Sequence, residues 1–84
     1  SSTNLKTLQS ELKEFTEKDM AEQLQINQLA TDISKMANAE QSYVITGKDN
    51  FLNTYKSKKD AIGTSLKNLN KSFKNKEKEK YKYT

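Results

Sequence analysis

Glu40, Tyr43 and Tyr55 are the residues of this 84-residue chain whose chemistry points most directly to a binding site. They lie in the stretch EQSYVITGKDNFLNTYK, residues 40–56, which also carries one of the chain's two glycines. A carboxylate and phenol hydroxyls can bind a small molecule or a protein ligand. They can equally bond to each other where two helices meet, and the residue types leave both interpretations open.

The composition excludes most familiar catalytic chemistry. The chain contains no His and no Cys, so the usual general base, the usual thiol nucleophile and most metal ligands are absent. It also lacks the glycine-rich loop that binds phosphate groups. We therefore expect a protein that is not an enzyme, with no catalytic residue, no cofactor and no bound metal.

The length and polarity of the chain favour one small domain, residues 1–84, that depends on long helices or on a partner. Apolar residues make up 32% of the sequence, and so short a chain buries a low fraction of its surface alone. No stretch approaches the roughly 20 apolar residues of a membrane-spanning helix, and no signal peptide pattern is present. The sequence thus predicts a soluble chain or a soluble piece of a longer protein.

The positive charge is concentrated at the end of the sequence. Residues 70–84 hold six Lys against two Glu, which equals the net charge of +4 of the whole chain. Such a tail could bind nucleic acid or an anionic lipid surface, or it could be the solvated end of a helix whose dipole favours Lys. Arg, which leads specific phosphate and base recognition, is absent. We favour the solvated helix end and expect no specific nucleic-acid partner.

The apolar positions predict a long first helix over about residues 4–46. They recur with alternating spacings of three and four in one heptad frame that contains Leu5, Leu8, Leu12, Phe15, Ile26, Leu29, Ile33, Met36 and Tyr43. Asp19, Glu22 and Glu40 are the polar members of the same frame. A frame sustained over this length is typical of a coiled-coil helix.

A turn over residues 47–49 should separate this helix from a second one over about residues 50–80. Gly47 suits the left-handed conformation that ends many helices, and Asp49 or Asn50 can cap the next helix. The frame of the second helix contains Leu52, Tyr55, Lys59, Ile62, Leu66, Leu69 and Phe73.

A tight turn makes consecutive helices antiparallel neighbours, so the two frames can be aligned. This alignment pairs Ile33 with Ile62, Leu29 with Leu66, Ile26 with Leu69, Met36 with Lys59, Asp19 with Lys76, Glu22 with Phe73 and Glu40 with Tyr55. We expect an all-α fold that is a long antiparallel helical hairpin. Its core seam should consist of Ile26, Leu29, Ile33, Met36, Ile62, Leu66 and Leu69.

Two helices cover only part of such a seam, so the hairpin should be half of a four-helix bundle. A second chain, or helices that are absent from this chain, could supply the other half. We expect a homodimer.

The corner between the helices also resembles a known family. The residues that carry the resemblance are Glu40, Tyr43, Thr46, Gly47, Asp49, Phe51, Leu52 and Tyr55. Their order resembles that in the CHASE3 sensor domains of bacterial receptors, and next the four-helix-bundle sensor domains of chemoreceptors. The chain departs from the pattern at Gln41-Ser42, where family members often carry Arg, and at Asn50, where they often carry Pro.

The resemblance implies an extracytoplasmic sensory module in the cell membrane of a bacterium, placed between flanking membrane helices that are absent from this chain. The receptor would be a methyl-accepting chemotaxis protein or a sensor histidine kinase, and helix shifts would relay binding. Glu40, Tyr43 and Tyr55 would then line a ligand pocket. The alternatives are a ligand-free structural or interaction hairpin, and an architectural corner in which Glu40 bonds to Tyr55 or pairs with Lys59. We favour the architectural corner.

Overall fold

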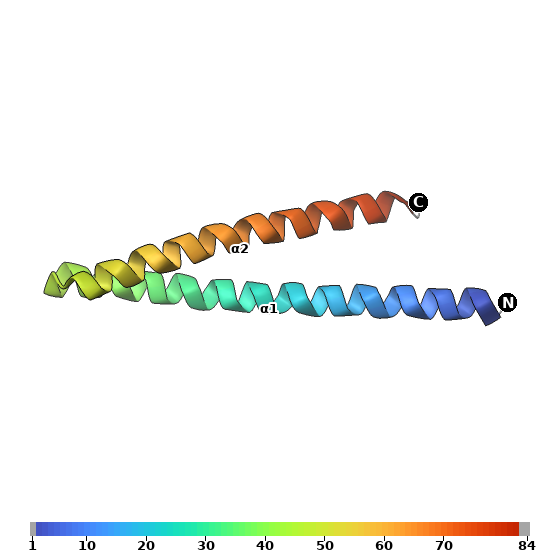
Figure 1. Ribbon diagram of the computed structural model, residues 1–84, viewed down its shortest axis with the longest axis horizontal. Coiled ribbons are helices and arrows are strands. Elements are labelled where there is room, and N and C mark those ends of the chain that lie inside the picture. The colour runs from blue at the N-terminus through green and yellow to red at the C-terminus, as the bar shows by residue number, and fades with distance from the viewer. Residues whose placement is uncertain (1, 83–84) are drawn as a thin grey trace.

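The computed structural model describes the backbone of residues 2–82 and the side chains of residues 4–80. Helix α1 (Ser2–Thr46) and helix α2 (Asp49–Lys82) run antiparallel, so that the start of α1 and the end of α2 lie at the same end of a rod (Figure 1). The rod measures 67 × 19 × 13 Å. The described residues contain no strand, and the predicted all-α antiparallel hairpin is confirmed. Each helix starts slightly earlier than expected, and α2 ends two residues later.

Local hydrogen bonds fix the turn between the helices. Gly47 has a φ of +66°, and its N–H donates to the carbonyl of Tyr43 at 2.7 Å, which closes the last turn of α1. The Thr46 hydroxyl donates to the carbonyl of Ser42 at 2.7 Å and accepts the N–H of Lys48 at 3.2 Å. A residue with a Cβ at Gly47 would be strained by about 1–2 kcal/mol in this left-handed conformation.

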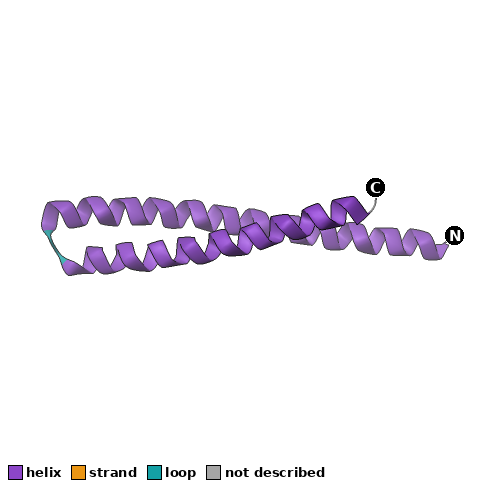
Figure 2. Cartoon of the chain, turned by 90° about the horizontal axis from the view of Figure 1, so that it is seen from above, coloured by secondary structure: helices purple, strands orange, loops and turns teal. Residues whose placement is uncertain are grey.

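The start of α2 differs from the expected cap. Asp49 lies inside the first turn of the helix, so its carboxylate complements the positive end of the helix dipole. The N–H of Phe51 donates to the carbonyl of Lys48 at 3.1 Å. Asn50 is also helical, and its carbonyl accepts the hydroxyl of Thr54 at 3.1 Å. The connection is therefore two residues long, Gly47 and Lys48 (Figure 2).

The core of the single chain is thin. Ala39 and Leu69 are its buried apolar residues, each 5% exposed, and none of the described side chains is completely buried. Leu29, Met36 and Ile62 are half-buried beside them. Neither described helix is apolar enough over a sufficient length to cross a membrane.

The expected seam needs a correction at Ile26, Ile33 and Leu66, which are 39%, 45% and 53% exposed. In each helix, some of the heptad positions of the frame face the other helix, and the rest face solvent. Asp32 is buried in place of Ile33, and Ser65 is half-buried in place of Leu66. The reason is geometric. One neighbouring helix covers a narrower stripe of residues than the apolar stripe that a helix buries in a four-helix bundle.

The residues displaced from the seam lie together on one side of the hairpin. Ile33 follows Asp32 by one residue, and Leu66 follows Ser65 by one residue. Because the helices are antiparallel, the same rotation along each chain brings both residues to the same side. We call this side the apolar face, and it consists of Ile26, Ile33, Leu66 and Phe73.

Candidate functional site

The structure brings the three predicted ligand-binding residues together beside the turn. Glu40, Tyr43 and Val44 of α1 and Leu52 and Tyr55 of α2 line one open hollow of about 270 Å³, which we call the corner hollow. Both tyrosines are half-buried, whereas Glu40 is exposed. The antiparallel alignment therefore predicted which residues of the two helices would be neighbours here.

The polar groups of the corner hollow do not bond to one another. Among the described side chains, no hydrogen bond joins Glu40 to Tyr43 or Tyr55, and no ion pair joins Glu40 to Lys59. The expected bond between Glu40 and Tyr55 is thus not formed in the single hairpin. A carboxylate and phenol groups that line the same hollow can bind hydrogen-bond donors or a cation.

The remaining corner residues are structural. Thr46, Gly47 and Asp49 form the turn and the start of α2, as described above. Phe51 is half-buried on the opposite side of the hairpin from the corner hollow, where it lies beside Ala39. It closes the turn end of the hairpin from that side.

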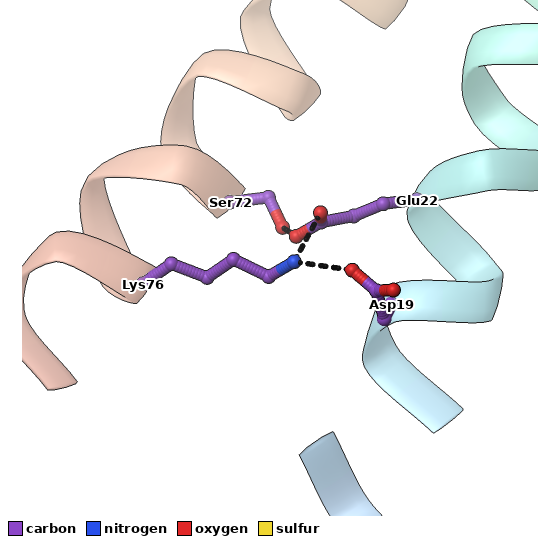
Figure 3. A network of polar contacts seen from close by, with 4 residues as sticks. All are labelled: Asp19, Glu22, Ser72 and Lys76. Atoms are coloured by element: carbon purple, nitrogen blue, oxygen red, sulfur yellow. Dashed lines mark hydrogen bonds and ion pairs between the residues drawn. The ribbon is translucent and has the colours of Figure 1, made fainter. Parts of the chain in front are cut away.

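A second cluster joins the helices near the chain ends, and we call it the polar clasp. It consists of Asp19 and Glu22 from α1 and Ser72 and Lys76 from α2 (Figure 3). Lys76 Nζ lies 2.8 Å from Asp19 Oδ1 and 2.7 Å from Glu22 Oε2. The Ser72 hydroxyl donates to Glu22 Oε1. One ammonium group therefore bridges two carboxylates across the helices.

The surroundings of Glu22 stabilise its charged form. Hydrogen bonds from Lys76 and then from Ser72 lower the pKa of Glu22 below its ordinary value of 4.5, against the opposing effect of burial. The hydrogen bonds to Asp19 and Glu22 raise the pKa of Lys76 above 10.5. Glu22 is only 7% exposed, and a buried carboxylate is tolerated when it is paired in this way.

The sequence predicted one part of the polar clasp and missed another. The pairing of Asp19 with Lys76 is confirmed. Glu22 was expected opposite Phe73, but it contacts Ser72 and Lys76 because α2 is rotated by one residue. Ser72 and Lys76 are four residues apart and therefore share one face of α2, which is the signal that could have found this contact.

Further charged contacts surround the polar clasp and extend toward the turn. Lys76 Nζ lies 5.5 Å from the centre of the Phe15 ring, and Lys18 pairs with Glu79 at 3.5 Å. Nearer the turn, the buried Asp32 pairs with Lys58 at 3.3 Å. The heptad frames did not include Asp32. No group of three potential metal ligands comes together within the described part of the chain.

Comparison with known proteins gives a match to one family. The family model of the CHASE3 domain matches residues 13–82, a stretch that includes the polar clasp, the turn and the corner hollow. No curated protein and no solved structure shows a significant match.

Proposed function

The chain belongs to the CHASE3 family of sensory domains, which occur in receptors and sensor kinases, and we propose that it is the extracytoplasmic sensory module of a bacterial transmembrane receptor. The receptor is a methyl-accepting chemotaxis protein or a sensor histidine kinase. The match over residues 13–82 carries the proposal, because it covers most of α1, the turn and all of α2. The proposed role is not enzymatic, since the sequence offers no His or Cys for catalysis.

The shape of the hairpin supports a role in relaying a signal. Both described ends lie at one end of the rod, opposite the turn (Figure 1). A displacement of α1 against α2 at the turn would therefore reach both ends. The corner hollow takes residues from both helices, so a ligand there can favour one relative position of the helices over another.

The polar clasp supplies contacts that such a displacement would change. Lys76 reaches Asp19 and Glu22 through side-chain atoms at 2.8 and 2.7 Å. Distances of this kind are sensitive to sliding, because hydrogen bonds weaken steeply away from their preferred geometry. If the ligand binds more tightly when α1 is shifted along α2 from its position in this structure, binding at the corner hollow would also change the distances in the polar clasp.

The location can be tested with a single cysteine in the whole receptor. The chain contains no Cys, and Lys48 is an exposed turn residue, so Lys48→Cys creates one reactive thiol in this domain. We expect a membrane-impermeant maleimide to label it in intact cells. The control is the same receptor with Lys48 retained and any thiols outside the domain removed. Labelling that requires cell lysis would overturn the extracytoplasmic assignment.

A ligand-free structural hairpin is the second candidate, and one observation favours it. All buried polar side-chain atoms in the described residues already have partners. Signalling output of the whole receptor separates the two candidates. Tyr43→Ala and Tyr55→Ala should alter that output if the corner hollow is a sensing site, with Leu24→Ala, at an exposed residue outside the hollow, as control. Unaltered output from a stable, expressed receptor would favour the structural hairpin.

A further inference from the structure

A row of four lysines runs along α2 on the side that faces away from α1. Lys67, Lys71, Lys74 and Lys78 are all exposed, and they follow one another at spacings of four, three and four residues. At 3.6 residues per turn, this spacing keeps them within about 60° of one another around the helix. The buried Leu69 lies about half a turn away from them. We call this row the lysine stripe.

The charges of the lysine stripe have no partner within the described part of the chain. No ion pair joins any of its four ammonium groups to a described carboxylate. Other lysines near the chain ends differ, because Lys76 is held by the polar clasp and Lys18 pairs with Glu79. Glu77 lies about a quarter of a turn to one side of the stripe, and Asp60 lies one heptad before its first lysine. The stripe is therefore a line of unpaired positive charge about 17 Å long.

The dipole of α2 does not account for the lysine stripe. The dipole favours cations only within the last turn of a helix, whereas the stripe begins at Lys67, about four turns before the end of α2 at Lys82. The charge also differs between the helices. Helix α1 holds four Lys against seven acidic residues, and α2 holds ten Lys against four. A surface that serves solubility alone has both signs interspersed, so the separation of the signs indicates a binding surface.

We propose that the lysine stripe binds a linear polymer of phosphate groups, which lies along α2. Such a chain contacts all four ammonium groups at once, whereas a single phosphate group is too small to span about 17 Å. Lys binds phosphate as a point charge, so the regular spacing of the four charges takes the place of a shaped pocket. The chain contains no Arg, which leads the reading of bases. The feature that is recognised is therefore the phosphate chain itself.

The neighbours of the lysine stripe favour a polymer over a lipid surface or a nucleic acid. Asn70 and Asn75 flank the stripe and are exposed. Leu66 and Phe73 of the apolar face lie about a third of a turn from its centre. A helix that lies on a membrane needs apolar side chains that enter the bilayer between its basic residues. Binding of single strands uses aromatic rings on which bases stack, and the ring of Phe73 is on that other side.

Neutralising the lysine stripe tests this proposal. Calorimetry measures the binding of long-chain inorganic polyphosphate to the 84-residue chain at several salt concentrations. Replacing the four stripe lysines by Gln should lower the affinity about 100-fold, and it should reduce the slope of log affinity against log salt by roughly three to four. The matched control removes the same charge from four exposed lysines of α1 and the turn, Lys6, Lys13, Lys35 and Lys48, also by change to Gln. It should lose no more than about threefold in affinity.

The outcomes separate the stripe from the total charge and the polymer from other anions. Equal losses in the two variants, or no binding by the wild-type chain, would overturn the proposal. At equal phosphate concentration, tighter binding to phosphatidylglycerol vesicles or to single-stranded DNA would also overturn it, in favour of a lipid surface or a nucleic acid. Both Gln variants should keep wild-type helical circular dichroism, because Gln and Lys have similar helix propensities. Changing the four stripe lysines to Arg keeps the charge and should keep the binding.

Discussion

The two halves of the hairpin are held together by different forces. In the turn half, residues 26–69, the contact between the helices includes Leu29, Met36, Ala39 and Leu69. In the terminal half, residues 4–25 and 70–80, the buried residue is Glu22, and its partners are Ser72 and Lys76. The turn half also contains the Asp32–Lys58 pair, and Gln28 donates a hydrogen bond to Asp32 at 3.2 Å.

The spacing of the helices explains the difference. Figure 1 shows the ribbons of α1 and α2 close together near the turn and farther apart toward their other ends. Small residues such as Ala39 permit a close approach in the turn half. In the terminal half the longer side chains of Lys76, Glu22 and Glu79 bridge the wider interval.

The consequence is that the two halves respond differently to conditions. Burial of apolar surface is non-directional and does not depend on protonation. The polar clasp requires a charged Glu22 and a charged Lys76 at hydrogen-bonding distance. Because its buried apolar residues are Ala39 and Leu69, we expect the turn half to depend less on protonation than the terminal half.

The largest expected effect is the loss of the fold in Leu69→Asp. Leu69 is 5% exposed, and an unpaired carboxylate there would cost about 4 kcal/mol or more of folding free energy. Because the remaining core is too small to keep the hairpin folded after that loss, the helical circular dichroism signal should disappear. Asn70→Asp adds the same charge at the exposed neighbouring residue and should remain folded. Wild-type helicity in Leu69→Asp would show that the turn half does not stabilise the fold.

A smaller and more local effect is expected for Glu22→Gln. The substitution keeps the shape of the side chain but removes the charge that bonds to Lys76 at 2.7 Å. Charged hydrogen bonds contribute roughly 1.5–3 kcal/mol, and Asp19 would retain Lys76, so we expect a loss of about 1–2 kcal/mol. Backbone amide exchange should accelerate in the terminal half while the turn half is unchanged. Asp19→Asn, at a more exposed carboxylate, is the control and should have a smaller effect.

The same contact predicts how stability depends on pH. Because the folded chain lowers the pKa of Glu22 below 4.5, folding releases protons from this group and is favoured at higher pH. The stability difference between wild type and Glu22→Gln should be full at neutral pH and should shrink as the pH falls below 4.5. Urea unfolding of both proteins across this range measures it. A difference that persists unchanged in acid would mean that the charge of Glu22 does not stabilise the clasp.

The sequence was sufficient to predict the hairpin but not the rotation of its helices. Heptad spacing and Gly47 predicted the helices, the turn and the Asp19–Lys76 contact, because these depend on periodicity and local conformation. The heptad frames could not show which side of each helix faces the other helix. That rotation depends on how closely the two helices approach each other, and as a result Asp32 is buried and Ile33 is exposed.

The smallest expected effect is the coupling between Glu40 and Tyr55, which lie at the same height beside the turn. The two side chains line the corner hollow but are not hydrogen-bonded to each other. Glu40→Ala and Tyr55→Phe should therefore have additive effects on the free energy of unfolding, within about 0.3–0.5 kcal/mol. The double-mutant cycle should be measured at dilution, so that contacts between copies do not contribute. A coupling well above that limit would mean that the corner closes on itself in solution, leaving its carboxylate engaged by Tyr55 rather than available to a ligand.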